Sequence, residues 1–204
     1  EVEYSVYAAQ DHAVAETLFN ELVEIVYDVA KETDGIRGYD ACINSVIVDT
    51  LSIPRSILID FGQDDCAGSD GRVRKGMILA EFSGRYREDG SVITISPSSF
   101  TVDDFEIHGT KTITNLGENA NGNLEFEVVV SNGQIDAPNN EYTIHWDATT
   151  TREWVEGDIS NWFIDDVYLI RGSANGVNRN GVTFDAVITT PLKVEVVCPW
   201  FTEG

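Results

Sequence analysis

Apolar and polar residues alternate along most of the chain after residue 73, which predicts β-strands with one buried and one solvated face. Asn-Gly or Asp-Gly dipeptides interrupt this alternation, and they favour the positive φ angles of tight hairpins. The dipeptides stand at 89–90, 121–122, 132–133, 175–176 and 180–181. We therefore predict a mostly β protein, an antiparallel sandwich, meander or open barrel of long strands.

Two parts of this strand pattern are irregular. The runs 92–95 and 100–107 are separated by Pro97, which predicts a bend or a sheet edge because proline cannot donate to a strand ladder. Residues 163–170 are apolar on both faces apart from Asp165 and Asp166, which predicts a bulge.

One helix precedes the strands, and it is predicted over residues 11–32. Asp11 is the expected N-cap, and Asp34-Gly35 is the expected end. The polar face carries glutamates, whereas helices at membrane surfaces prefer lysine and arginine, so we expect the helix to pack on the sheet. The apolar stripe is Val14, Leu18, Leu22, Ile25, Val26 and Val29, and the glutamates are Glu16, Glu21, Glu24 and Glu32.

These segments predict a single domain over residues 1–204. The helix at 11–32 is followed by a transitional region, 36–72, with short strands at 43–53 and 57–61 and the start of a polar loop. The antiparallel ladder then occupies 73–204. A chain of 204 residues is long enough for one β domain with a full core.

Charge narrows the range of partners. Thirteen basic residues against thirty-five acidic ones give a net charge of -22, which predicts no nucleic-acid binding and repulsion from anionic membranes. Cations, cationic partners such as a basic protein, and neutral ligands such as glycans remain compatible with this surface. No apolar run approaches the ~20 residues of a spanning helix, so no transmembrane segment is predicted.

The three cysteines predict one disulfide and one free thiol in an exported protein. None belongs to a C-x-x-C pair and no histidine cluster accompanies them, which argues against structural zinc. Cys42 and Cys66 flank a strand-like segment and are one candidate pair. Cys198 is an equal alternative as the partner of Cys66.

No established catalytic motif is present, and paired carboxylates are the remaining catalytic candidate. Glu125 and Glu127 share one face of a predicted strand, with Cα atoms ~6.7 Å apart. That spacing overlaps the ~6.5–9.5 Å between the carboxyl groups of inverting glycosidases. Any acidic pair at this spacing does the same, so a solvated face is the simpler interpretation.

The loop around residues 64–71 is a candidate calcium site. Asp64, Asp65 and Asp70 offer carboxylates in a short, glycine-containing stretch, and hard cations prefer such oxygen ligands. The spacing does not match an EF-hand. The alternative is a polar turn held by the neighbouring cysteine and by Arg72, Arg74 or Lys75.

Tryptophans suggest a ligand-binding surface near residues 154–162. Trp154 and Trp162 flank Glu156 and Asp158, and exposed tryptophan beside acids is typical of sugar-binding faces. The alternative is that these tryptophans close one end of a β core. A local function is expected in the loops at 64–71 and 154–162, while the strands hold the shape of the protein.

Several short strings accompany the N-terminal helix: Asp60-Phe61-Gly62, 70–78, Gly109-Thr110 with Asn115, 152–157 and Cys198-Pro199-Trp200. Together they resemble the uncharacterised exported lipoproteins of Bacteroidetes-type bacteria. The resemblance implies a location in the cell envelope or at the cell surface, with a lipid anchor upstream of Glu1. It implies no catalytic residue.

Together these features predict a non-enzymatic, exported cell-envelope protein that acts as a binding or structural module. One alternative is a carboxylate-based, glycosidase-like hydrolase. A second alternative is a carrier for an apolar ligand inside an open β structure.

Overall fold

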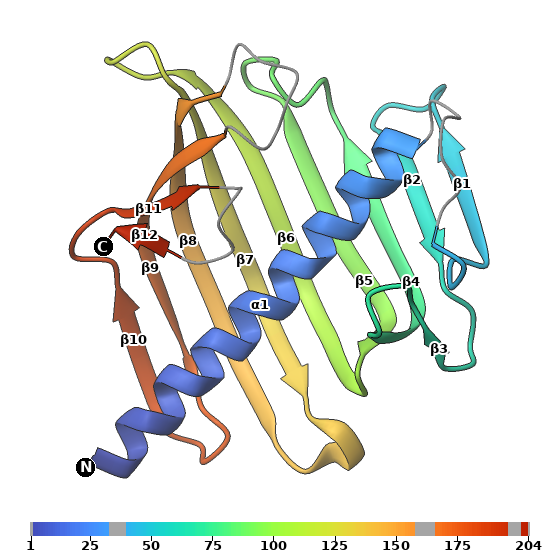
Figure 1. Cartoon of the computed structure of the whole chain (residues 1–204), viewed down its shortest axis with the longest axis vertical. Coiled ribbons are helices and arrows are strands. Elements are labelled where there is room, and N and C mark those ends of the chain that lie inside the picture. The colour runs from blue at the N-terminus through green and yellow to red at the C-terminus, as the bar shows by residue number, and fades with distance from the viewer. Residues whose placement is uncertain (1, 33–39, 158–165, 196–200, 204) are drawn as a thin grey trace.

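A computed structural model describes residues 2–32, 40–157, 166–195 and 201–203. It shows a long helix, α1 (Val2–Glu32), lying diagonally across one face of an open antiparallel sheet (Figure 1). This confirms the predicted fold class. The strands are β1 (Ser45–Asp49), β2 (Arg55–Asp60), β3 (Cys66–Ala67), β4 (Val73–Phe82), β5 (Val92–Val102), β6 (Phe105–Glu118), β7 (Leu124–Asp136), β8 (Thr143–Glu156), β9 (Val167–Val177), β10 (Thr183–Val187), β11 (Leu192–Glu195) and β12 (Phe201–Glu203).

The sheet is a meander, which decides among the three predicted arrangements. Its strands run in the order β1-β2-β4-β5-β6-β7-β8-β9-β11-β12, so neighbours in sequence are mostly neighbours in space. β3 pairs with one end of β4, and β10 pairs with the second half of β9. We call the face that α1 covers the inner face and the opposite one the outer face.

Three of the five predicted turn dipeptides lie in hairpin turns. Gly90, Gly122 and Gly181 follow β4, β6 and β9, with φ angles of 73°, 81° and 74°. L-residues rarely adopt this left-handed conformation, which glycine tolerates. Local turn chemistry therefore defines these three hairpins.

The other two dipeptides lie inside strands, so the turn prediction was wrong there. A Cβ atom on Gly133 in β7 would stand 2.1 Å from the Trp146 carbonyl oxygen and 3.2 Å from the Phe19 ring. One on Gly176 in β9 would stand 2.1 Å from the His145 carbonyl oxygen. Glycine is needed at these positions because neighbouring groups approach closely, not because the chain turns.

Pro97 lies in an interior strand rather than at an edge. β5 runs between β4 and β6, and Pro97 faces Ile78 of β4. The predicted bend appears instead as a register shift toward β6 between Ile95 and Phe100. The run predicted at 100–107 is also divided, because Asp103 and Asp104 adopt φ angles of 49° and 66° and form the β5–β6 turn.

The helix is longer than the pattern predicts, and Asp11 is not its N-cap. α1 begins at Val2, and Asp11 is fully buried within it, where it accepts hydrogen bonds from the Arg179 backbone and guanidinium. The predicted apolar stripe is confirmed, and its members Val14 and Ile25 are partly buried and pack against the core. Leu18, Leu22, Val26 and Val29 are buried, together with Ala15 and Phe19.

Polar contacts fix the helix to the inner face at three further levels. Trp146 donates its indole N–H to His12 Nδ1 at 2.9 Å. Lys111 Nζ in β6 donates to the Phe19 carbonyl at 3.2 Å and to Asn20 Oδ1 at 2.7 Å. Glu21 bonds the Arg74 guanidinium. Glu21 is therefore buried against the sheet, which corrects its predicted place on the polar face of the helix.

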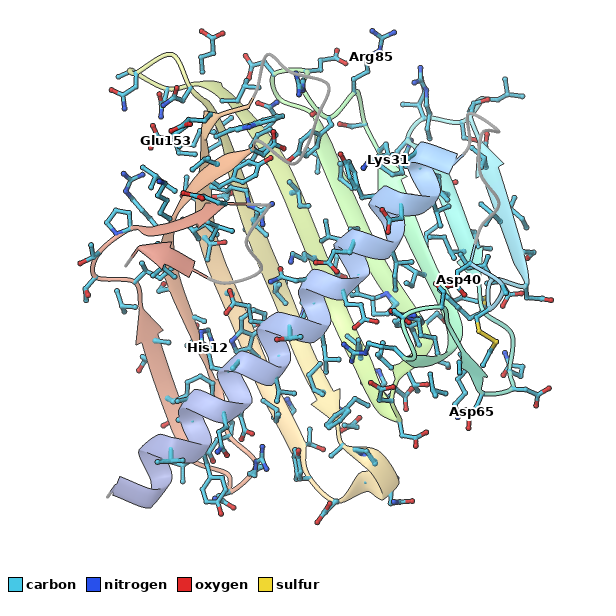
Figure 2. The ribbon with its side chains drawn as sticks, in the orientation of Figure 1. His12, Lys31, Asp40, Asp65, Arg85 and Glu153 are labelled. Carbon is cyan, nitrogen blue, oxygen red and sulfur yellow. A yellow bond between two sulfur atoms is a disulfide. The ribbon has the colours of Figure 1, made fainter. Side chains whose placement is uncertain are left out.

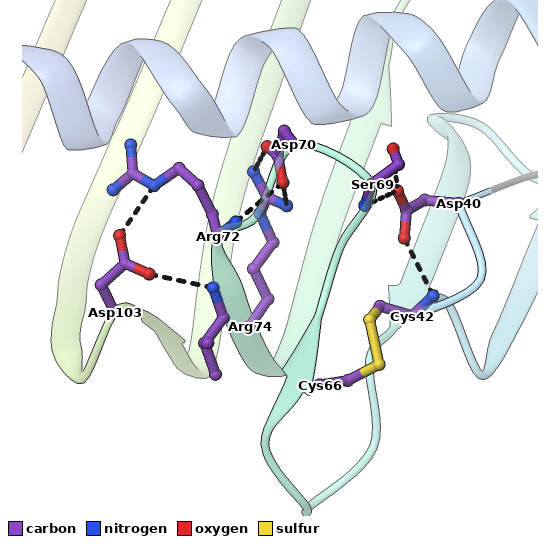
Figure 3. Close-up of a disulfide and its surroundings, with 9 residues drawn as sticks. Asp40, Cys42, Cys66, Ser69, Asp70, Arg72, Arg74 and Asp103 are labelled. Atoms are coloured by element: carbon purple, nitrogen blue, oxygen red, sulfur yellow. Dashed lines mark hydrogen bonds and ion pairs between the residues drawn. A yellow bond between two sulfur atoms is a disulfide. The ribbon is translucent and has the colours of Figure 1, made fainter.

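A disulfide joins Cys42 to Cys66, with Cα atoms 5.5 Å apart. It links the segment before β1 to β3, as Figure 3 shows. This confirms one of the two predicted pairings. Cys198 lies outside the described residues. Of the expected bulge at 165–166, only residue 166 is described.

Removing this crosslink by Cys42→Ala with Cys66→Ala is expected to lower the free energy of unfolding by about 3 kcal/mol. The disulfide closes a loop of sequence separation 24, and such a loop restricts the unfolded chain. Urea denaturation of the double variant and the parent measures the difference. An unchanged midpoint and slope would contradict it.

Within the described ranges, no helix combines the length and apolarity needed to cross a membrane.

Candidate ligand-binding site

Aromatic rings and arginines gather at one end of the inner face, near the end that Glu153 and Arg85 mark in Figure 2. We call this group the aromatic–cation cluster. It contains Tyr86, Phe126, Trp154, Tyr168, Arg87 and Arg152.

Strand register explains how the cluster assembles. Phe126 of β7 faces Arg152 of β8, and Trp154 of β8 faces Tyr168 of β9. Since side chains alternate along a strand, Arg152 and Trp154 point to the same face. Tyr86 comes from the turn after β4, where its carbonyl accepts a hydrogen bond from Asn115 Nδ2 at 3.0 Å.

The rings form two pairs, and an arginine lies over each ring of the second pair. Tyr86 stacks on Phe126 with ring centroids 4.6 Å apart, and Trp154 packs against Tyr168 at 5.5 Å. The Arg87 guanidinium lies 4.5 Å from the Trp154 ring centre, and that of Arg152 lies 5.2 Å from the Tyr168 ring. Such cation–π contacts are within the ~6 Å range of attraction.

The two tyrosine hydroxyls stay neutral near physiological pH. Burial raises the pKa of Tyr168, whose hydroxyl donates a hydrogen bond to Asp166 Oδ2 at 3.0 Å. Burial also raises the pKa of Tyr86. The tyrosines therefore contribute ring surface and neutral hydroxyls rather than negative charge.

Two donors of the cluster have no acceptor in the part of the chain that the structure describes. The Trp154 indole N–H is buried there without a hydrogen-bond partner, and Trp154 is only 4% exposed. Arg152 is half-buried and, among the described residues, forms no ion pair with a carboxylate. The cluster thus presents unused hydrogen-bond donors beside aromatic faces.

The four residues that the sequence predicted to form a ligand-binding surface near this end do not come together as one exposed surface in the described structure. Trp154 is buried, in agreement with the interpretation that it closes the β core, so its ring is not an exposed platform. Glu156 is exposed at the end of β8. Asp158 and Trp162 lie outside the described residues.

The candidate calcium loop does not assemble as a metal site. Lys75 Nζ contacts Asp65 at 2.7 Å, and Arg74 holds Asp70, as Figure 3 shows for the second pair. The Arg74 hydrogen bond lowers the pKa of Asp70 to about 2. Asp64 is exposed, and the described part of the chain contains no group of three acidic, histidine or cysteine side chains able to hold a metal. The geometry favours the alternative of a polar turn.

The carboxylates considered for hydrolysis lie on the outer face. Glu125 of β7 pairs with Glu153 of β8, and Glu127 points to the same side of the sheet as Glu125. Hydrogen bonds from Asn123 and Asn119, with further ones from Arg171 and Asn121, lower the pKa of Glu153 to about 2. A glycosidase needs one carboxyl with a raised pKa as its general acid, and Glu153 is shifted in the opposite direction.

The inner face leaves little room for an apolar ligand beside the helix. Phe19 and Leu22 of α1 have no exposed surface, and neither do Ile78 of β4 and Ile144 of β8. Phe19 also packs against the Trp146 ring with centroids 5.7 Å apart. The helix therefore occupies the position in which such a ligand would have to lie.

No protein-family model, curated protein or solved structure matches the chain. The resemblance to exported lipoproteins, and with it the location in the cell envelope, stays a prediction. Function is therefore inferred from the geometry of the described residues.

Proposed function

We propose that the protein is an exported, non-catalytic binding module of the cell envelope whose aromatic–cation cluster binds a saccharide carrying carboxylate groups. The Cys42–Cys66 disulfide supports the exported location, because disulfides persist in oxidising compartments. The unused donors of the cluster support the binding role.

The observation that carries this proposal is the buried, unpaired indole N–H of Trp154. Leaving a buried donor unsatisfied costs about 1–3 kcal/mol. An acceptor oxygen supplied by a ligand would remove that penalty. Because most buried polar groups in native proteins are paired, an exception beside aromatic rings and arginines points to a binding site.

The chemistry of the cluster selects the class of ligand. No carboxylate of the described residues pairs with the Arg152 guanidinium, and arginine binds carboxylates with two parallel hydrogen bonds. The half-buried Tyr86 ring offers apolar surface to the C–H face of a sugar, whereas the buried Trp154 contributes its indole N–H. The net charge of -22 opposes an anionic ligand at long range, but salt screens this repulsion beyond about 8 Å.

Oligogalacturonate, a chain of carboxylate-bearing sugars, is expected to bind, and neutral galactose oligomers of equal length are expected to bind at least about tenfold more weakly. Arg152→Gln should weaken oligogalacturonate binding by about 10- to 100-fold, since a charge-assisted hydrogen bond contributes about 1.5–3 kcal/mol. Isothermal titration calorimetry measures both differences.

The matched control is Arg55→Gln, which removes an exposed arginine from β2, far from the cluster along the strand order. It changes net charge equally and should leave binding unchanged. Absence of heat with the parent protein, or equal weakening by the two variants, would contradict the proposal. Circular dichroism of each variant separates lost binding from lost structure.

A further inference from the structure

Exposed apolar side chains are concentrated at the β1 end of the sheet. Leu51 and Ile53, in the β1–β2 turn, are 93% and 94% exposed, and Ile47 in β1 is 60% exposed. The turn is ordered, because Asp49 Oδ1 accepts hydrogen bonds from the backbone N–H groups of Leu51 and Ser52 at 2.9 and 3.0 Å. Apolar side chains held outward at a sheet edge indicate an interaction surface.

β1 is also an edge strand whose backbone can accept another strand. It stands last in the strand order, and Figure 1 shows it at the right-hand margin of the sheet. The Phe61 N–H donates to the Gly76 carbonyl oxygen, one position past the paired residues of β2 and β4. Hydrogen-bonded pairs alternate along an antiparallel ladder. Counting back along β2 from Phe61, every second residue therefore bonds to β4, and the residues between them bond to β1. Ile47 faces Leu58 and thus bonds to β2, which leaves the backbone groups of Val46 and Val48 directed outward.

The sequence of β1 is complementary to itself in an antiparallel pair. With a two-fold axis beside Ile47, each Val46 would form a hydrogen-bonded pair with Val48 of the other copy, and the two Ile47 residues would face each other. Ser45 would face Asp49. No like charges would be opposed, although like charges directly opposite destabilise a pair.

The same register would bring together, on the outer face, a row of apolar side chains from each copy. Ile47 faces Leu58 in β2, and Leu58 faces Leu79 in β4. Leu79 is 36% exposed, which is high for a leucine within a sheet. Pairing at Ile47 would make one continuous row of apolar side chains across six strands, three from each copy.

We propose that β1 is the dimerisation edge of this protein, pairing antiparallel with β1 of a second copy around Ile47 to form one continuous sheet. This interface lies at the opposite end of the strand order from β8 and β9 of the aromatic–cation cluster. It does not depend on the proposed ligand. Failure of one proposal therefore leaves the other untouched.

Sedimentation velocity over a range of protein concentrations tests the dimer. The parent is expected to form dimers that strengthen as salt rises, because each copy carries a net charge of -22 and salt screens their repulsion. Ile47→Lys would place two ammonium groups opposite each other and should weaken dimerisation at least about tenfold. Val187→Lys, at a site 67% exposed in β10, is the control and should leave it unchanged.

Crosslinking tests the register. Ile47→Cys in a Cys198→Ser background should oxidise to a covalent dimer, because facing residues of a non-hydrogen-bonded pair have Cα atoms about 4.5 Å apart, within disulfide range. Val48→Cys in the same background should not, because its counterpart in the other copy is displaced along the strand. A parent that stays monomeric at all concentrations, or equal crosslinking of the two cysteine variants, would overturn the proposal.

Discussion

Replacing Glu21 with alanine is expected to lower the free energy of unfolding by about 3–5 kcal/mol, the usual cost of breaking a buried ion pair from one side. Glu21 Oε1 accepts hydrogen bonds from Arg74 Nε and Nη2 at 2.9 and 2.7 Å. Its Oε2 lies 2.8 Å from Arg72 Nη1, an ion pair rather than an aligned hydrogen bond. Without Glu21, the Arg74 side chain, which is 8% exposed, keeps the more exposed Asp70 as its one carboxylate partner among the described residues.

Urea unfolding followed by circular dichroism measures this loss. Glu16→Ala is the matched control on the same helix, because the Glu16 side chain is 43% exposed and its ion pair in the described residues is with His12. That variant should change stability by no more than about 0.5 kcal/mol. A similar small change for Glu21→Ala would show that the contact to Arg74 does not hold the helix on the sheet.

Stability is expected to rise as pH increases from about 7 to about 10. Burial, with a smaller contribution from Arg152, lowers the pKa of Lys111 to about 7 from its ordinary value of 10.5. Between these two values the unfolded chain binds the proton and the folded chain does not, so unfolding becomes less favourable as pH rises. At about 1.4 kcal/mol for each unit of pKa difference, the rise is on the order of 4 kcal/mol. Below pH 7 both states are protonated, and this contribution is constant.

Lys111→Met tests the origin of that slope. Methionine keeps an unbranched apolar stem at the buried position, although it loses the contacts to Phe19 and Asn20. Urea unfolding at several pH values should show the rise in the parent and its loss in the variant. A parent whose stability is flat or falls over this interval would contradict the assignment, and so would a variant that keeps the rise.

The elements of the fold could be predicted where their signals are local. Alternation placed most strands, and the spacing of Leu18, Leu22 and Val26 identified the buried stripe of α1. The same local rules fail where a residue serves a distant contact. Gly133 looks like a turn glycine, but it is required by Trp146 and Phe19, which approach it from another strand and from the helix.

The polar contacts that fix the helix could not be predicted from the sequence for the same reason. Glu21 and Arg74 are 53 positions apart, and Asp11 and Arg179 are 168 apart, so no local pattern relates them. A glutamate on a helix is normally solvated, and only a buried partner reverses that expectation.

The candidate site was foreseen only in part. Tryptophan content drew attention to Trp154, whereas Arg152 and Tyr168 carried no signal of their own. Period-two alternation places Arg152 and Trp154 on one face, but only the register with β7 and β9 brings them to Phe126 and Tyr168. Strand register depends on the whole sheet and cannot be read from one strand.

Ligand binding at the aromatic–cation cluster is tested most directly by the nuclear magnetic resonance signal of the Trp154 indole N–H during titration with oligogalacturonate. Trp154→Phe assigns this signal by its loss. We expect the indole proton of Trp154 to move downfield as it gains an acceptor, while that of Trp146, already bonded to His12, stays in place. A Trp154 signal that does not move at saturating oligogalacturonate would contradict the proposed site.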